Sequence, residues 1–376
     1  MWLRARLRVL FGFLALIPAV AGAAPFGVRF FVNTPSVAST ASRFPLGAEL
    51  YDLATGLRVT TNGVSISLNL LRCPGYPSSC SVTVVTSGFA SGNTSAGVVN
   101  FSNVRIATDN TDYYFSATAS GYNTGTSNVF DVDQAVVRFG AIPATPVSTA
   151  SRFGLVASIR RGTQPADPID TLASGIPIRL SLLSCLGYPG SCSVSVLDSN
   201  FANAVTSSGS ATFSSLAVTP SGEDRYFSSA TPGYSGINTG TSDVFDVAQG
   251  TVRIDTPLSY VFAGVPFVVN ASIRAGSLLS DPVDVLADGI PLRLSLVTCP
   301  GYPMGCSPSV LNSNFANGVS SNGLVPLAGL VIPTIGSDRY FTTSTPGVSS
   351  ISFTTSQVFE VVDQADFIFA NGFEGP

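Results

Sequence analysis

The sequence has no histidine and no lysine, and all 18 of its basic residues are arginine. The lack of histidine excludes the serine–histidine and cysteine–histidine pairs of nucleophilic catalysis. The lack of lysine excludes Schiff-base chemistry and the lysine–asparagine isopeptide cross-links found in some surface domains. The commonest nucleophilic mechanisms are therefore closed to this chain.

Charge of either sign is also scarce, at 11% of residues. Outside the three arginines of the N-terminal segment, 15 arginines face 22 acidic residues, for a net charge of −7. Nucleic acids and anionic membranes require clustered basic residues, so neither is an expected partner. Because 45% of residues are hydrophobic, the chain has too much apolar surface to be disordered.

The N-terminal segment has the pattern of a secretory signal peptide over residues 1–23. Three arginines precede an apolar stretch over residues 9–20, and Ala21-Gly22-Ala23 provides small residues for cleavage. A membrane anchor is the alternative, but the stretch is short for a span and Pro18 interrupts it. No later segment is predicted to cross a membrane. We expect an exported protein, extracellular or on the cell surface, with the periplasm as the alternative location.

What is present is a motif used three times, Cys-x-Gly-Tyr-Pro-x-x-Cys. It begins at Cys73, Cys185 and Cys299, at offsets of 112 and 114 residues. Units of solenoids are about 20 to 50 residues long, whereas this spacing is the length of a small domain. The chain is therefore predicted to hold three similar domains in tandem.

All six cysteines lie in these motifs, which predicts three disulfides, Cys73–Cys80, Cys185–Cys192 and Cys299–Cys306. Paired cysteines behind a signal peptide indicate disulfides formed in an oxidising compartment. Zinc is the alternative, but zinc normally takes four ligands of the Cys or His type, and each motif offers two. Pro-Gly and Gly-Tyr-Pro are turn signals, so each bond should staple a hairpin and stabilise it by about 2 kcal/mol.

Each repeat contains about seven short segments in which apolar and polar residues alternate, separated by turn residues. Examples from the first repeat are residues 43–51, 64–68 and 127–132. Alternation with a period of two is typical of half-buried strands, and no helical periodicity appears after the N-terminal segment. About seven strands in about 110 residues predict an antiparallel β-sandwich with Greek-key connections.

Three of these segments resemble bacterial immunoglobulin-like (Ig-like) repeats of surface and secreted proteins. In the second repeat they read Gly175 to Leu182, Asp224-Arg225-Tyr226-Phe227 and Ser242 to Val247. The resemblance implies an all-β chain of three tandem Ig-like antiparallel β-sandwich domains after the signal peptide. We expect them at residues 24–133, 134–247 and 248–363. The junctions contain no flexible linker, which predicts a stiff rod.

The last residues, 364–376, differ from the other repeat ends. Ile368-Phe369-Ala370-Asn371-Gly372-Phe373-Glu374 resembles a short tail that closes many secreted proteins of gammaproteobacteria. A final strand and a recognition tag for export or surface display are both open interpretations.

The hairpin tyrosines Tyr76, Tyr188 and Tyr302 are candidate ligand contacts. A tyrosine between Gly and Pro on a stapled turn can offer an exposed aromatic ring to a sugar or a protein. The alternative is that the ring packs over the disulfide or the sheet edge.

Four acidic residues of the first repeat, Asp109, Asp112, Asp131 and Asp133, are weak candidates for a calcium site at a domain end. The chain has no dense calcium-loop pattern. The alternative is that these acids are solvated or paired with arginine. No other metal site and no cofactor are expected.

A module repeated in an exported, thinly charged protein favours a non-catalytic role. A glycosidase needs only two acids, but three similar, acid-poor domains offer no unique cleft. We expect an extracellular or cell-surface rod for adhesion or spacing, whose ligand is a protein or a polysaccharide. The alternative is an array of carbohydrate-binding modules that use the hairpin tyrosines. In both cases linked weak sites would gain effective concentration.

Overall fold

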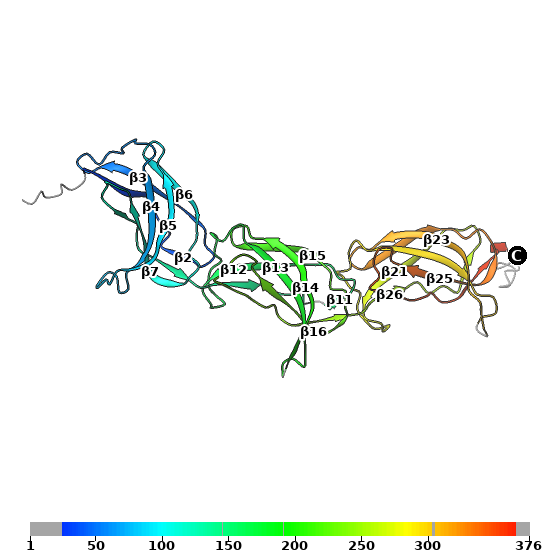
Figure 1. The fold of residues 1–376 in the computed structure, drawn as a ribbon. Helices are drawn as coiled ribbons and strands as arrows, with labels where there is room; N and C mark the ends of the chain where they lie inside the picture. The colour runs from blue at the N-terminus through cyan, green and yellow to red at the C-terminus, as the bar shows by residue number, and fades with distance from the viewer. Residues whose placement is uncertain (1–24, 145, 191, 303–304, 366–376) are drawn as a thin grey trace, which may run out of the picture. The chain divides into compact units, whose positions relative to one another are not determined.

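The computed structural model describes residues 25–144, 146–190, 192–302 and 305–365. Within them, each repeat forms its own pair of β-sheets (Figure 1). The predicted signal peptide and residues 366–376 of the predicted tail lie outside the described residues. In the described part of the chain, no helix is long and apolar enough to cross a membrane.

The first repeat contains strands β1 to β9. Their bounds are β1 Phe26–Val32, β2 Val37–Ser39, β3 Phe44–Asp52, β4 Ser65–Arg72, β5 Thr83–Asn93, β6 Val98–Val104, β7 Asn110–Thr118, β8 Gly125–Thr126 and β9 Phe130–Asp133. One sheet has the order β1-β3-β6 and the other β2-β9-β7-β4-β5, with β8 paired to β7.

The second repeat contains strands β10 to β18. Their bounds are β10 Ala135–Phe139, β11 Val147–Ser148, β12 Phe153–Arg161, β13 Pro177–Leu186, β14 Ser193–Val205, β15 Ser210–Leu216, β16 Gly222–Ala230, β17 Ile237–Asn238 and β18 Phe245–Ala248. The sheets have the orders β15-β12-β10-β17 and β11-β18-β16-β13-β14.

The third repeat contains strands β19 to β27 in the same arrangement. Their bounds are β19 Gly250–Ile254, β20 Tyr260–Phe262, β21 Phe267–Ala275, β22 Pro291–Thr298, β23 Ser309–Val319, β24 Leu324–Leu330, β25 Gly336–Ser344, β26 Ile351–Phe353 and β27 Phe359–Val362. The sheets have the orders β24-β21-β19-β26 and β20-β27-β25-β22-β23.

This strand order is that of an Ig-like sandwich. The first strand divides between the two sheets, as β10 and β11 do, and the central strands β13, β16 and β18 form one face. Most neighbours are antiparallel, but β11 lies parallel to β18, β20 to β27, β10 to β17 and β19 to β26. The predicted fold class is confirmed. The pairings of β11 with β18 and of β20 with β27 arise because the first strand crosses from one sheet to the other.

Aromatic residues of corresponding strands fill the space between the two sheets of each repeat. Phe115, Phe227 and Phe341 are 0% exposed. Each contacts a phenylalanine of the last strand, as Phe341 does with Phe359 at a centroid distance of 5.1 Å. Burying such a side chain contributes about 1.5–3 kcal/mol. Because neighbours on a strand face opposite sides, a buried phenylalanine points the tyrosine before it outward.

The chain divides into two compact units after Asp133, except that Ser39–Ser42 belong to the second unit. The second and third repeats lie together in that unit. Their cores are separate clusters, one built around Phe227 and the other around Phe341.

Candidate functional site

Each cysteine loop closes a hairpin of two strands. The hairpins are β4–β5, β13–β14 and β22–β23. The paired ends are Arg72 with Thr83, Leu186 with Ser193, and Thr298 with Ser309. The three cysteine pairs lie at disulfide distance, with Cα–Cα separations of 5.0, 5.0 and 5.2 Å. The first cysteine of each pair is buried, so the loop is tied to the sheet edge at that residue.

One aspartate per repeat holds the base of this loop in place. Asp112, Asp224 and Asp338 have positive φ angles of 62°, 55° and 55°, each at an irregularity in the strand ladder. Their carboxylates accept hydrogen bonds from the backbone N–H groups of Gly75, Gly187 and Gly301, at 3.2, 3.2 and 3.4 Å. These glycines also have positive φ, a conformation that glycine adopts without a steric penalty.

The hairpin tyrosines are exposed rather than packed away. Tyr76 and Tyr188 are 55% exposed, and Tyr302 is 56% exposed. The backbone N–H of each tyrosine donates to the carbonyl of the first cysteine in its loop, at 3.2, 3.1 and 3.2 Å. The tight turn therefore fixes the backbone of the residue whose ring projects from it.

Beneath each hairpin tyrosine lies a pocket, and the three pockets have corresponding linings. Each is lined by the first cysteine, the hairpin tyrosine, an outward tyrosine of the Asp-x-Tyr-Phe strand, and a run of Thr, Ser, a variable residue and Val. The outward tyrosines are Tyr114, Tyr226 and Tyr340. The cavity volumes are about 450, 480 and 280 Å³ in the first, second and third repeats.

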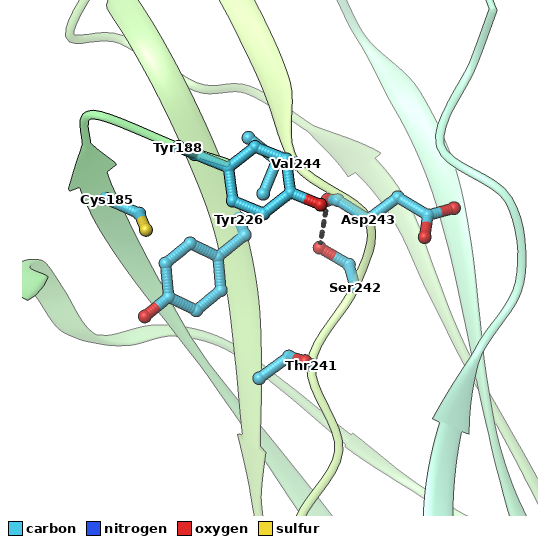
Figure 2. Close-up of a pocket in the computed structure, with 7 residues that line it drawn as sticks. All are labelled: Cys185, Tyr188, Tyr226, Thr241, Ser242, Asp243 and Val244. Atoms are coloured by element: carbon cyan, nitrogen blue, oxygen red, sulfur yellow. Dashed lines mark hydrogen bonds between the residues drawn. The ribbon is translucent and has the colours of Figure 1, made fainter. Parts of the chain in front are cut away.

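Figure 2 shows this pocket in the second repeat. The ring of Tyr188 comes from the hairpin and the ring of Tyr226 from strand β16, with Val244 near both. Tyr226 is half-buried, so one part of its ring rests on the sheet while the rest remains accessible. Two aromatic rings from different elements thus form the walls of one open pocket.

The serine in the lining has a structural role. The hydroxyl of Ser242 accepts a hydrogen bond from the N–H of Phe227 at 2.9 Å. It also donates to the carbonyl of Asp243 at 2.8 Å, the bond drawn in Figure 2. Ser127 and Ser356 make the same two bonds in the other repeats. Since these hydroxyls are occupied, the groups free to contact a ligand come from the residues on either side.

The residue after this serine differs between repeats. It is Asn128, Asp243 and Gln357, and all three are exposed. In Figure 2 the carboxylate of Asp243 points away from Tyr226, at the rim of the pocket. The aromatic walls are therefore constant, while the polar group at the rim varies.

The described residues that line the three pockets include no arginine and one acid, Asp243. Binding there depends on aromatic faces and on neutral hydroxyl and amide groups. Such a lining suits an uncharged polar ligand with both apolar faces and hydrogen-bonding edges.

The four aspartates considered for a calcium site differ in their contacts and positions. Asp131 accepts the backbone N–H of Asp112 at 2.9 Å, and Asp112 in turn accepts Gly75. Asp109 is exposed, and Asp133 ends strand β9. Among the described residues, no three carboxylates or cysteines gather in a group able to hold a metal ion. The contacts of Asp112 and Asp131 are those of loop-positioning residues.

Sequence reasoning did not identify Tyr114, Tyr226 and Tyr340 as part of the site. The signal was available, because the motif Asp-x-Tyr-Phe recurs in all three repeats. A buried phenylalanine in that motif requires the adjacent tyrosine to face outward. What the sequence could not supply is that this face lies under the hairpin loop.

No protein-family model and no curated protein matches the sequence. Three solved structures illustrate the similarities found. The I9–I11 tandem of titin is 8% identical, with 89% of this chain and 99% of that chain covered and a TM-score of 0.35. Three N-terminal domains of the bacteriophage RB49 Highly Immunogenic Outer Capsid protein are 11% identical, with 90% and 99% covered and a TM-score of 0.26. Extracellular domains 3–5 of Drosophila OTK are 11% identical, with 90% and 99% covered and a TM-score of 0.19. Similarities at this level carry no argument about function.

Proposed function

We propose that this chain is a non-catalytic, exported adhesion protein in which each Ig-like repeat binds a carbohydrate through the pocket under its hairpin tyrosine. The observation that carries the proposal is the recurrence of one two-tyrosine pocket in all three repeats. A spacer would need the three sandwiches but would not need an open aromatic pocket at the same place in each.

The chemistry of the pocket favours a sugar over other ligands. A sugar ring presents an apolar face, which can pack on a tyrosine ring, and hydroxyl groups at its edge, which bond to polar side chains. The walls and the rim of each pocket offer both kinds of contact. The volumes of about 280 to 480 Å³ lie at or below the lower part of the range for small-molecule pockets. Each site would therefore hold a short piece of a chain.

Three such sites in one chain fit attachment to a polymer. A single open pocket binds weakly, but a second site on the same chain binds its neighbour at a high effective concentration. Avidity can exceed the affinity of one site by 10² to 10⁴ without any new contact. A polysaccharide with repeated units is the kind of ligand that would engage several pockets together.

Export is supported by the cysteine pairs. Disulfides persist in oxidising compartments, and the three pairs lie at disulfide distance. In this proposal the predicted signal peptide delivers the chain to that compartment, and three domains within residues 24–363 display the pockets outside the cytoplasm.

The test is a glycan array and a polysaccharide pull-down of residues 24–376, run beside a variant with Tyr76→Ala, Tyr188→Ala and Tyr302→Ala. The matched control is Tyr260→Ala, because Tyr260 is also exposed, at 42%, but lines none of the three pockets. Retention by the parent and by the control, with loss of at least tenfold in the triple variant, is the expected result.

Equal retention of the parent and the triple variant would reject the hairpin tyrosines as the site. No retention of either would reject carbohydrate binding and leave the alternative of a spacer or a protein adhesin. Circular dichroism of each variant separates loss of binding from loss of fold.

A further inference from the structure

Two repeats share an identical four-residue segment, Ser-Thr-Ala-Ser, at the start of the sandwich. It is Ser39–Ser42 in the first repeat and Ser148–Ser151 in the second, and we call it the junction segment. All eight residues are buried, with exposures of 0 or 1%. Small polar residues are rarely buried together unless they have partners. The segment satisfies some of its own N–H groups, but the acceptors of all its hydroxyl groups lie in the following repeat.

The second junction segment docks on Asp284 of the third repeat. The hydroxyls of Ser148 and Ser151 donate to one carboxylate oxygen of Asp284, at 2.5 and 2.7 Å. The other oxygen accepts the backbone N–H of Leu286 at 2.9 Å. Asp284 is 2% exposed, so this carboxylate is satisfied almost wholly by buried donors, two of them from the preceding repeat.

The two central residues of the segment extend the contact. The hydroxyl of Thr149 donates to the carbonyl of Ser350 at 2.6 Å and accepts the N–H of Gly250 at 2.9 Å. Ala150 is a member of the hydrophobic core cluster of the third repeat. The second repeat therefore places one apolar side chain inside its neighbour and satisfies the polar groups around it.

The first junction segment makes the same contacts within the second unit. The hydroxyls of Ser39 and Ser42 donate to one oxygen of Asp170, at 2.5 and 2.6 Å, and Asp170 is 1% exposed. Thr40 donates to the carbonyl of Gly236, and Ala41 belongs to the core cluster of the second repeat. One segment and one receiving aspartate thus occur twice in the same geometry.

The third repeat lacks the segment. Strands β20 and β27 pair in the same parallel register as β11 and β18, which aligns Phe262–Val265 with Ser148–Ser151. Neither serine nor the threonine is kept, and Val265 is 38% exposed.

The first repeat lacks the receiving aspartate. The N–H of Val59 donates to the carbonyl of Leu50, as Asp170 does to Ile159 and Asp284 to Ile273, so Val59 occupies that position. The backbone there is alike in all three repeats, because Gly97, Gly209 and Gly323 each lie against the carbonyl of this residue. Only the side chain that would receive a junction segment is absent.

We propose that the junction segment and the receiving aspartate form a directional connector that fixes the order of the three repeats. The first repeat donates only, the second receives and donates, and the third receives only. The partner of each receiving surface is a Ser-Thr-Ala-Ser segment of a preceding repeat, and any repeat that carries Asp at this position accepts it. The connector is independent of the carbohydrate pockets, none of whose lining residues belongs to it.

Hydrogen–deuterium exchange of the mature chain tests the connector. In a Ser148→Ala, Ser151→Ala variant and in Asp284→Ala, the amides of Ser151 and Gly250, whose acceptors are the carbonyl of Ser148 and the hydroxyl of Thr149, should exchange at least tenfold faster. The matched control is Asp288→Asn, an exposed carboxylate four residues from Asp284, which should leave exchange unchanged. Unchanged protection of these amides in the double serine variant, with the native circular dichroism spectrum, would overturn the proposal. The serine variant keeps Asp284 intact, so the test stands even where Asp284→Ala unfolds the third repeat.

A pair of four-repeat chains tests direction. One carries an extra copy of residues 134–247 inserted after residue 247, and the other an extra copy of residues 248–363 inserted after residue 363. Each new junction is directly connected, but only the first brings a junction segment to a receiving aspartate. We expect limited proteolysis to spare the new junction of the first chain and to cut that of the second. Equal resistance of the two new junctions would contradict the directional connector.

Discussion

The first and third repeats each bury one acid at the same corner of the sandwich, but the partners of that acid differ. In the first repeat the buried acid is Glu49 on strand β3, held by Arg29 at 2.7 Å and by Arg58 at 2.6 Å, all within one repeat. In the third repeat the position of Glu49 is Ser272, and the buried acid is Asp284 in the adjoining loop. It is held by serines of the preceding repeat.

The difference concerns where the stability of this corner comes from. The corner of the first repeat is self-contained, because its two arginines also cover Tyr51 and Phe31, at 4.8 and 5.9 Å from the ring centroids. The corner of the third repeat depends on the second. The same backbone therefore supports a corner closed by residues of its own repeat or a corner completed by the preceding repeat. A few side chains decide between the two.

The largest effect should follow from removing the receiving aspartate. Asp284→Ala leaves two buried serine hydroxyls and one buried N–H without their acceptor, and each unsatisfied buried group costs about 1–3 kcal/mol. We expect the third repeat to lose about 3 kcal/mol, whereas Val59→Ala at the matching position of the first repeat should cost about 1 kcal/mol. Exchange of repeat-specific peptides across a urea series measures both. Equal losses would remove the contrast between the two corners.

Replacing the glycine that lies against this corner should destabilise the first and third repeats equally. This sharpens the comparison, because the backbone is then the feature tested. A Cβ on Gly323 would lie 2.4 Å from the carbonyl oxygen of Asp284, and one on Gly97 would lie 1.7 Å from that of Val59. Both glycines also have positive φ, of 76° and 77°. Strained backbone of this kind costs about 1–3 kcal/mol. Gly323→Ala and Gly97→Ala should each destabilise their own repeat by about 2 kcal/mol in the urea series. A large difference would mean that the two backbones are not equivalent.

Local features of the fold were well predicted from sequence. Val64 to Leu68 alternates clearly, and a Cys-x-Gly-Tyr-Pro turn follows it, so both the strand and the hairpin could be expected. Phe115 and its counterparts could be expected in the core because they recur beside alternating apolar positions. Such signals lie within a few residues of one another, where period and turn chemistry are decisive.

Features that join distant segments could not be predicted in the same way. Ser148 and Asp284 are 136 residues apart, and a buried Ser–Asp contact leaves no periodic signal. The strand expected over residues 43–51 begins directly after the first junction segment, but the segment itself has no alternation of apolar and polar residues that would mark it. Likewise Tyr76 and Tyr114 line one pocket because the strand that carries Tyr114 runs beneath the hairpin, and the sequence alone does not show this arrangement.

A smaller effect is expected from the acid of the closed corner. Glu49→Gln keeps the shape and one acceptor oxygen but removes the charge that two arginines bind. The arginine side chains are 44% and 48% exposed, so water screens the ion pairs and limits their value. We expect a loss of about 1 kcal/mol in the first repeat only. The same urea series measures it, and Asp52→Asn, also in strand β3, is the matched control. A loss that spread to the third repeat would contradict a self-contained corner.

The smallest and most specific effect is the response of this corner to pH. Burial alone would raise the pKa of Glu49, but hydrogen bonds and charge from Arg29 and Arg58 outweigh it, and the pKa lies below its ordinary value of 4.5. A carboxylate with a lowered pKa stabilises the folded state above its unfolded pKa, and the stabilisation is lost as pH falls through the folded value. Acidification below about pH 4.5 should therefore weaken the first repeat of the parent chain, and Glu49→Gln should remove that part of the pH dependence. Repeat-resolved exchange at equal urea, compared at pH 6 and at successive steps below pH 4.5, measures the difference. If the parent and Glu49→Gln lost stability in parallel across these steps, Glu49 would not be the group responsible.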